Sequence, residues 1–204
     1  MHFPKLFKSE DFNVLKEIIS ENSFSSLVTY NEKILSTKAM MQLSEFENEH
    51  FIIETHISRA NPVARKIKEG DEVLCDFLGA HSYISSSWYD HINVSTWNYE
   101  EVQIYGTVEI MSDNELYNHL KKLTDFFELP QKCPMTLDRM GAEFVEKEMK
   151  GALGIKIIPT DVKIKRKLSQ NRDVVNYQRV IENLNNSDFP MDKIIAKKMT
   201  DLKK

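Results

Sequence analysis

The sequence predicts an α+β protein in which an antiparallel β-sheet or barrel has flanking helices and a helical C-terminus. Two observations favour this class. Segments rich in β-branched and aromatic residues recur through most of the chain, and single amphipathic segments interrupt them without the regular strand–helix alternation of a parallel sheet. The 204 residues suffice for one sizeable core, and no linker divides them. We therefore expect a single domain over residues 1–204, with helices at 173–200 packing as an appendage.

The first half of the chain predicts one helix and several strands. Ser9 is expected to cap a helix near residues 9–22, where apolar residues recur at helical spacing. Asn31–Glu32 is a turn signal, and Gly79–Ala80 is expected to separate two strands. Residues 63–67 are expected to form about one or two helical turns after a proline. The expected strands are 24–29, 33–40, 50–56, 72–78 and 82–85.

The second half adds a long half-buried strand and more helices. Residues 101–111 alternate apolar with other side chains, as a strand with one buried face does. Ser112 and Glu115 have the spacing of a capping box and start a helix that ends near residue 128. Pro159–Thr160 is expected to separate two strands. The remaining strands are expected at 153–158 and 161–168, and the remaining helices at 138–148, 173–184 and 189–200.

Composition excludes several classes of protein. With 41% hydrophobic residues and a formal charge of −4, the chain is typical of soluble globular proteins. No apolar run approaches the roughly 18 residues that cross a bilayer, and the first residues do not resemble a signal region, so we expect a cytoplasmic protein without membrane contact. Cys75 lies in an apolar run far from Cys133, which argues against a disulfide framework and a cysteine zinc site.

Positive charge is concentrated at the C-terminal end. Residues 161–204 carry 11 basic and 6 acidic side chains, which leaves 16 basic and 25 acidic side chains for residues 1–160. A nucleic-acid surface is one interpretation of this basic end. A solvated helix face, or contact with an anionic cofactor or an acidic partner subunit, is the alternative.

Aromatic residues gather in the middle of the chain. The window from Phe77 to Tyr105 holds seven of the 20 aromatic residues, among them both tryptophans, mixed with histidine, hydroxyl and amide side chains. This mixture suits a flat, heteroatom-rich ligand, because rings offer faces for stacking and polar groups read the ligand edge. A buried corner of the sheet with satisfied polar atoms would have the same composition.

Two junctions between strands and helices carry polar and cationic side chains. Ser58 and Arg59 follow an expected strand, where backbone N–H groups, a hydroxyl and a guanidinium form the parts of a phosphate site. A helix cap with a surface arginine is the alternative. The segment 167–172, Lys-Leu-Ser-Gln-Asn-Arg, lies at a second junction, where Ser169 or Asn171 is expected either to cap the next helix or to join a ligand-binding group.

Other chemistries have little support. The chain has no glycine-rich nucleotide loop and no nucleophile elbow, so no catalytic residue is assigned. His50 and His56 share a face of one strand, but no nearby histidine or cysteine completes a metal site.

Several segments together resemble one known family. They are His81-Ser82-Tyr83-Ile84-Ser85-Ser86-Ser87-Trp88-Tyr89, Thr96-Trp97-Asn98-Tyr99, Tyr105-Gly106 and Lys167-Leu168-Ser169-Gln170-Asn171-Arg172. The opening Phe3-Pro4-Lys5 with Phe7, and the run Arg59-Ala60-Asn61-Pro62, agree with them. On these motifs the chain resembles, over nearly its whole length, the PaiB family of FMN-binding negative transcriptional regulators, which belongs with the FMN-binding split barrels.

The resemblance implies a split β-barrel that binds FMN as a homodimer, with two flavin sites between the subunits. It implies that Ser58 and Arg59 hold the flavin phosphate, that Gln103 lies beside the flavin, and that residues 169–172 approach the isoalloxazine from the second subunit. Through the family it also implies repression of protease production and sporulation genes. The implied cofactor-binding residues are Lys38, Ser58, Arg59, Asn61, His81, Tyr83, Ser85, Ser87, Trp88, Trp97, Gln103, Ser169, Gln170, Asn171 and Arg172.

The chain departs from the family pattern at several of these positions. Ala80, Ser86 and Ser95 replace prolines, and Met40 replaces another. Lys38 stands where relatives usually have histidine. Gln103 matches the distant oxidases rather than close relatives, which often carry histidine there. These changes concern flavin affinity more than the fold.

Other functions remain open at this point. A flavin-dependent oxidoreductase would have a substrate pocket over the flavin, lined by Trp88, Trp97, Tyr99 and His81. A split-barrel scaffold for another planar ligand, such as haem or a pyridoxal species, would have His56 or His81 as a candidate ligand. DNA contact would fall on the C-terminal helices, whose cationic residues are Arg172, Arg179, Lys193, Lys197 and Lys198.

Overall fold

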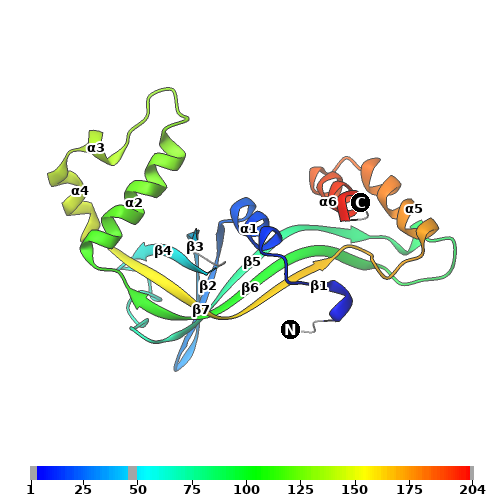
Figure 1. The fold of residues 1–204 in the computed structure, drawn as a ribbon, viewed down its shortest axis with the longest axis horizontal. Helices are drawn as coiled ribbons and strands as arrows, with labels where there is room; N and C mark the ends of the chain where they lie inside the picture. Colours follow the sequence, from blue (N-terminus) through cyan, green and yellow to red (C-terminus); the bar gives the residue numbers. More distant parts are fainter. Residues whose placement is uncertain (1–3, 46–49, 203–204) are drawn as a thin grey trace. The chain divides into compact units, whose positions relative to one another are not determined.

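The computed structural model describes residues 4–45 and 50–202, so Phe3 of the opening motif lies outside the described residues. The strands are β1 Lys8–Ser9, β2 Phe24–Asn31, β3 Lys33–Glu45, β4 Phe51–Ser58, β5 Glu72–Ile84, β6 Thr96–Ile110 and β7 Ala152–Lys167 (Figure 1). The α-helices are α1 Phe12–Glu21, α2 Asp113–Glu128, α3 Leu137–Met140, α4 Ala142–Met149, α5 Val174–Asn185 and α6 Pro190–Leu202. Short 3-10 helices cover Lys5–Phe7 and Ser86–Trp88.

The strands form one sheet whose neighbours run antiparallel. The order is β1-β7-β4-β3-β2-β5-β6, and an additional pairing of β7 with β6 closes it. β2 and β3 form the predicted hairpin, in which Glu32 turns the chain with a φ of 62°. The α+β class with an antiparallel barrel and a helical C-terminus is confirmed.

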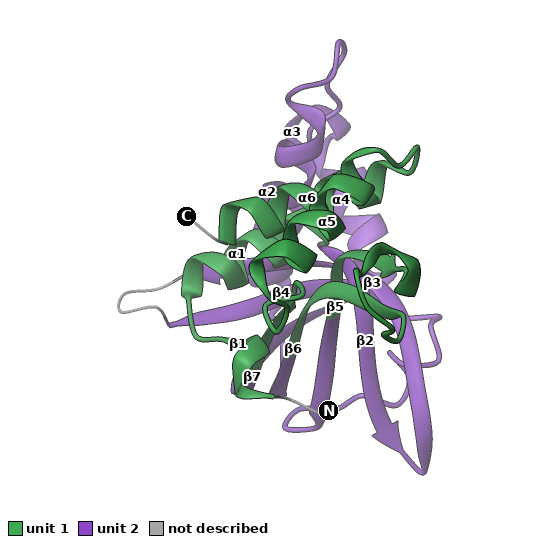
Figure 2. Cartoon of the chain, turned by 90° about the vertical axis from the view of Figure 1, so that its right-hand side faces the viewer, with its two compact units in different colours: residues 1–22, 77–103, 163–204 green, residues 23–76, 104–162 purple. Residues whose placement is uncertain are grey.

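The chain folds as two compact units (Figure 2). Unit 1 consists of residues 1–22, 77–103 and 163–204, and unit 2 consists of residues 23–76 and 104–162. The boundaries fall within β5, β6 and β7. A single domain with residues 173–200 as an appendage stays a prediction.

Unit 2 buries the alternate side chains of its strands. Leu27, Met41, Ile53 and Ile155 are shielded from solvent completely, and each such side chain contributes roughly 1.5–3 kcal/mol by burial. Cys75 lies in the same core as a free thiol, and burial raises its pKa to about 12.

Unit 1 places the C-terminal helices against its part of the sheet. Figure 1 shows α5 and α6 on one side of β5, β6 and β7. Their apolar side chains pack with those of the strands in one cluster, in which the buried Tyr177 hydroxyl also donates to Met199 O at 2.7 Å. The cluster contains Ala80, Ile84, Tyr89, Leu168, Tyr177, Val180, Ile181, Leu184, Ile195, Ala196 and Met199.

Three helix boundaries differ from the expectation. α1 begins at Phe12, because the Asp11 side chain accepts from Asn13 N at 2.8 Å while Ser9 belongs to β1. α5 is capped by Asp173 rather than by Ser169 or Asn171. The helix expected at 138–148 is split into α3 and α4, because Gly141 between them has a φ of 83°.

Two of the expected strand breaks are absent. Gly79 does not interrupt β5, since a Cβ at this position would lie 3.2 Å from Glu100 O, so the glycine permits close packing inside a continuous strand. Pro159 does not interrupt β7, because it lies between the segment paired with β4, which ends at Ile157, and the segment paired with β1, which begins at Ile164.

The capping box of α2 is confirmed, and both of its hydrogen bonds are present. The Ser112 hydroxyl accepts from Glu115 N, and the Glu115 carboxylate accepts from Ser112 N at 2.8 Å. In the part of the chain that the structure describes, no helix combines the length and apolar character needed to span a membrane.

Candidate functional site

One side of the sheet in unit 1 carries some of the ring-bearing residues that the sequence analysis selected. His81 and Tyr83 are two residues apart on β5, as are Trp97 and Tyr99 on β6, so each pair shares a face. The opposite side is the one covered by helices, since Ala80 and Ile84 belong to the cluster with α5 and α6.

Ring and lysine contacts join three strands on this side. Trp97 lies 5.9 Å from the Tyr83 ring and 6.3 Å from the His81 ring, measured between centroids. Lys165 of β7 lies 4.7 Å from the Tyr99 centroid, and its Nζ donates to the Tyr99 hydroxyl. We call this surface the aromatic–lysine face. Its members are His81, Tyr83, Trp97, Tyr99, Lys165 and Lys167.

The face is open at its centre and positively charged at one edge. Trp97 is 52% exposed and Tyr83 is 47% exposed. Lys167 is half-buried, its Nζ donates to Thr96 Oγ1, and burial together with nearby Lys165 and Arg172 lowers its pKa. The arrangement offers aromatic surface beside mutually repelling cations.

The polar segment after β7 is held by local hydrogen bonds. Ser169 has a φ of 62°, and its buried hydroxyl donates to Asn98 Oδ1 at 3.1 Å. The Gln170 side chain donates to Arg166 O at 2.5 Å and accepts from Leu168 N at 2.7 Å, so its amide is used at both ends. The conformation of this segment is therefore fixed before any ligand binds.

The end of the same segment is more accessible. Asn171 is exposed, and no side-chain hydrogen bond joins it to the other described residues. The guanidinium of Arg172 lies 4.8 Å from the centroid of the Tyr89 ring. Asn171 and Arg172 are thus the members of the segment with donors left for a ligand.

The serine-rich turn after β5 separates the two tryptophans. The Ser85 hydroxyl accepts from Ser87 N and lies 2.9 Å from Ser87 Oγ, which closes the short 3-10 helix. Trp88 packs against the helical cluster, and its carbonyl oxygen accepts from Arg179 Nε at 2.8 Å. The structure brings Trp97, Tyr83 and His81 together and places Trp88 against the helices instead.

Gln103 lies farther along β6 on the side of Trp97 and Tyr99. Its Nε2 donates to Glu101 Oε1 at 3.1 Å. The place of Gln103 beside a flavin remains a prediction.

Unit 2 carries the second group of expected residues. The exposed Lys38 Nζ donates to Ser26 Oγ at 2.7 Å across the β2–β3 pair. Asn61 donates to Thr37 Oγ1 at 2.8 Å and accepts from Val63 N at 2.9 Å, which orders the turn that follows β4. Lys38 is therefore next in sequence to Thr37, the residue of β3 that Asn61 contacts.

Ser58 and Arg59 end β4 beside this turn. The Ser58 hydroxyl accepts from Ala60 N at 3.2 Å, and its own proton remains available. Arg59 is exposed and forms no ion pair within residues 4–45 and 50–202. It lines a hollow of about 560 Å³ whose other residues are Asp113, Asn114, Tyr117, Glu146, Met149 and Lys150.

A histidine pair in unit 2 was not anticipated as a pair. His56 Nδ1 and His119 Nε2 are 3.1 Å apart, which joins β4 to α2. Burial, His56 and Lys122 lower the pKa of His119 to about 4, and burial lowers the pKa of His56. The only advance signal for the pair was His56 on a strand, because sequence spacing does not show which helix residue faces it.

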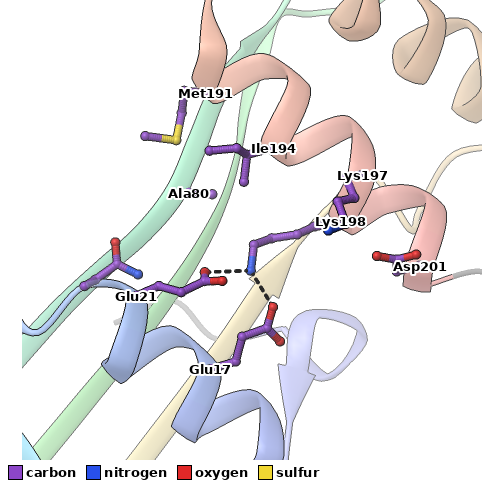
Figure 3. A pocket seen from close by; sticks show the side chains of 9 residues that line it. Glu17, Glu21, Ala80, Met191, Ile194, Lys197, Lys198 and Asp201 are labelled. Carbon is purple, nitrogen blue, oxygen red and sulfur yellow. Dashed lines mark hydrogen bonds and ion pairs between the residues drawn. The ribbon is translucent and has the colours of Figure 1, made fainter. Parts of the chain in front are cut away.

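A buried ion network in unit 1 was also not anticipated. Lys198 of α6 forms ion pairs with Glu17 and Glu21 of α1 (Figure 3). Its Nζ also lies 2.9 Å from the carboxylate of Glu100 on β6. Burial lowers the pKa of Lys198, but the three carboxylates outweigh burial and raise it above its ordinary value. A hollow of about 520 Å³ lies beside the network, and none of the expected cofactor-binding residues is among the described residues that line it.

The FMN implied by the motifs can be tested against these groups. Lys38, Ser58 and Arg59 are exposed and keep donors that suit a phosphate. The open rings of Trp97 and Tyr83, with the free amide of Asn171, suit the face and the edge of an isoalloxazine. The chemistry of the donor set therefore fits FMN. No cluster of three metal-ligating side chains occurs among the residues described.

Comparison with known proteins agrees with this chemistry. The sequence model of the family described as "Putative FMN-binding domain" matches residues 1–161. The chain is 36% identical over 202 residues to "Protease synthase and sporulation protein PAI 2" of Bacillus subtilis (strain 168), and the match covers 98% of this chain and 97% of that protein.

Solved structures show the same fold at low sequence identity. The FAD and haem binding protein of Mycobacterium smegmatis is similar with a TM-score of 0.59 and 15% identity, over 84% of this chain and 78% of that one. The flavocytochrome Anf3 of Azotobacter vinelandii is similar with a TM-score of 0.57 and 14% identity, over 84% of this chain and 75% of that one. The motifs, the family match and the near full-length relative together show that this chain belongs to the FMN-binding family of the PaiB type, whose cofactor is FMN.

Proposed function

We propose that this chain is a cytoplasmic FMN-binding regulator that represses protease production and sporulation genes as a homodimer. The observation that carries the proposal is the match to the Bacillus subtilis protein named for protease synthesis and sporulation. That match extends over 202 residues and so includes the segment 169–172. This segment lies beyond residues 1–161, which the family model matches. Because this chain matches that protein over residues 1–161 and over the segment 169–172, we propose that it has the same cofactor site and the same regulatory role.

In this proposal the cofactor lies between two copies of the chain. The phosphate end is formed by Lys38, Ser58 and Arg59 of one copy, whose cationic and hydroxyl groups are exposed. Asn61 orders the turn beside them. The segment 169–172 of the second copy meets the ring edge, where the Asn171 amide pairs with the pyrimidine and the Arg172 cation favours negative charge. FMN supplies one- and two-electron chemistry when it is bound.

Direct DNA contact has weaker support than cofactor binding. Arg179 donates to Trp88 O, Lys198 is bound by carboxylates, and Arg172 lies on a tyrosine ring. Of the five cations expected to face DNA, Lys193 and Lys197 are left exposed. Two lysines on a chain of net charge −4 give a small footprint, so we propose that repression does not depend on an extended phosphate contact.

The regulatory proposal is tested with a protease-promoter reporter in a strain that lacks the gene. We expect the wild-type chain to lower reporter output and Arg59→Ala to restore it. Arg65→Ala, an exposed arginine of the same turn region, is the control and should repress as the wild type does. Equal reporter output with and without the wild-type chain would refute the regulatory role.

The aromatic–lysine face favours a second candidate, a flavin-dependent oxidoreductase. Open rings beside cations on β5, β6 and β7 could hold a small reactant against the cofactor. This candidate predicts that the FMN-loaded protein oxidises a nicotinamide donor. The absorbance of the reduced donor measures this oxidation. No donor oxidation above that of free FMN would exclude it for such donors.

A further inference from the structure

The segment after β7 contains one residue in an unusual backbone conformation. Ser169 has a φ of 62°, in the left-handed region that residues other than glycine rarely occupy. The backbone N–H of Arg172 donates to Ser169 O at 3.0 Å, so residues 169–172 form a closed turn. The positions of the Asn171 and Arg172 side chains therefore depend on the conformation of Ser169.

A buried amide of β6 contacts this turn. The side chain of Asn98 is completely buried, and its Oδ1 accepts from Ser169 Oγ at 3.1 Å. The Nδ2 group of the same amide donates to Met199 Sδ of α6 at 3.4 Å. One side chain thus joins β6 both to the turn and to the last helix.

The next residue on the same side of β6 makes a parallel set of contacts. Glu100 pairs with Arg166 of β7 at 2.6 Å and with Lys198 of α6 at 2.9 Å. Because the thioether that Asn98 contacts in α6 is a weak acceptor, these ion pairs rather than Asn98 attach the helix. The contact that distinguishes Asn98 is therefore the one to the turn.

We propose that Asn98 is a positioning residue, which holds Ser169 in the left-handed conformation and so fixes the turn 169–172. Without this bond, the left-handed state of a residue with a Cβ is about 5- to 30-fold less populated than the right-handed state. The affinity for a ligand that needs this turn falls by the same factor. The effect of Asn98 on FMN rests on the proposed function, whereas its effect on the turn does not.

Two variants of Ser169 isolate the backbone conformation. Ser169→Ala and Ser169→Gly both remove the hydroxyl that donates to Asn98, but only glycine occupies the left-handed region without a Cβ penalty. We expect Ser169→Ala to weaken FMN binding about 5- to 30-fold and Ser169→Gly to weaken it clearly less. Flavin fluorescence on titration measures both affinities. Equal weakening by the two variants would overturn the inference.

Rescue by glycine tests Asn98 itself. Asn98→Ala removes both hydrogen bonds of the amide and should weaken FMN binding as Ser169→Ala does. Adding Ser169→Gly to Asn98→Ala should restore most of this loss, whereas adding Ser169→Ala should not. Glycine at the turn does not repair a loss of packing around Asn98, so rescue identifies a conformational effect. If Asn98→Ala does not fold, the two Ser169 variants decide the question.

Riboflavin, which lacks the phosphate of FMN, shows which end of the cofactor the turn meets. Asn98→Ala should weaken riboflavin and FMN by the same factor, whereas Arg59→Ala should weaken FMN alone. Ser82→Ala is the matched control, because it removes a bond from β5 to Asp192 of α6 without touching the turn. It should leave both affinities unchanged. Weakening by Ser82→Ala equal to that by Asn98→Ala would assign the effect to α6 and overturn the inference.

A measurement without flavin separates this inference from the proposed function. The backbone ¹³C shifts of Ser169 in labelled full-length protein report its φ. They should indicate the left-handed conformation in the wild type and lose it in Asn98→Ala. This result in a chain that fails to bind FMN would support the inference and refute the cofactor proposal. An unchanged Ser169 conformation in Asn98→Ala would overturn the inference whether or not FMN binds.

Discussion

At the scale of single residues, Arg59 carries the phosphate end of the proposed cofactor site. It is exposed at the end of β4 and has no ion pair among the described residues, so its guanidinium is available for a bidentate phosphate contact. Asn61 and Gln170, by contrast, use their amides within the chain. Their replacement would alter local structure as well as any ligand contact.

Arg59→Ala should weaken FMN binding about 10- to 100-fold, because one charge-assisted contact is lost. Flavin fluorescence quenching on titration measures this change. Arg65→Ala is the matched control, since it removes an exposed arginine six residues away. If both variants bind FMN as the wild type does, Arg59 does not hold the phosphate.

His119 should make the stability of unit 2 depend on pH. Its pKa is about 4 in the folded protein against an ordinary value of 6.5, so the unfolded chain binds the proton more readily. The stabilisation is complete above about pH 7 and is lost as the pH falls from about 6.5 to about 4, by roughly 3 kcal/mol at 1.36 kcal/mol per pKa unit.

Urea unfolding at pH 7.5 and at pH 5.0 measures this loss. His119→Phe keeps a ring in the buried position and removes the titration, so its free energy of unfolding should fall less between the two pH values. An equal fall in the wild type and the variant would show that other groups cause the pH dependence.

At the scale of elements, the attachment of α6 depends on Lys198. Its side chain is 8% exposed and joins α6 to α1 and to Glu100, whose side chain is 1% exposed. Lys198→Ala leaves the Glu100 carboxylate paired with Arg166, and should lower the free energy of unfolding by about 3 kcal/mol. Glu17→Gln removes a half-exposed carboxylate and should cost less than about 1 kcal/mol in the same denaturation experiment.

Replacing two glycines by alanine compares the stability cost of overcrowding with the stability cost of backbone strain. A Cβ at Gly106 would lie 2.5 Å from Ile158 O and 2.6 Å from Ile157 Cγ2, so Gly106→Ala should destabilise the protein by about 3 kcal/mol or prevent folding. Gly70 has a φ of +80° with nothing within 4 Å of a built Cβ, so Gly70→Ala should cost about 1 kcal/mol. Thermal unfolding of both variants tests whether Gly106→Ala loses more stability than Gly70→Ala. Equal losses of stability would contradict this prediction.

Local signals predicted most elements well. The β2–β3 hairpin and the α2 capping box follow from short-range chemistry, and both are confirmed. Gly79 and Pro159 misled the prediction, because whether such a residue ends a strand depends on which neighbours approach it. The break at Gly141 was missed because a left-handed residue inside an amphipathic pattern leaves the periodicity intact.

The candidate site was predicted as residue types but not as contacts. The window around Trp97 was selected for its residue types, and the structure joins Trp97 to Tyr83 and His81. Strand register and helix packing determine where Trp88 lies and which partners Lys165 and Lys167 have. Sequence spacing alone does not contain that information.

At the scale of the whole molecule, the proposed dimer predicts complementation between copies. Arg59→Ala and Asn171→Ala each damage one half of the cofactor site, and Asn171 is exposed, so its loss should leave folding intact. If the two halves come from different copies, a heterodimer of the two variants contains one intact site and one doubly damaged site. The mixed sample should then bind about one FMN tightly per heterodimer, whereas either variant alone binds none tightly.

Equilibrium titration with reversible subunit exchange measures this stoichiometry. Sedimentation of the wild type provides the control and should give the mass of two chains. If the mixed sample binds no FMN tightly, both halves of the site come from the same copy.

The central claim, that this chain binds FMN, is tested most directly by titrating FMN-free protein with FMN while following flavin and tryptophan fluorescence. The account predicts saturable binding of one FMN per chain, with quenching of the exposed Trp97 and weakening by Arg59→Ala. Absence of saturable binding by a folded wild-type chain would contradict it.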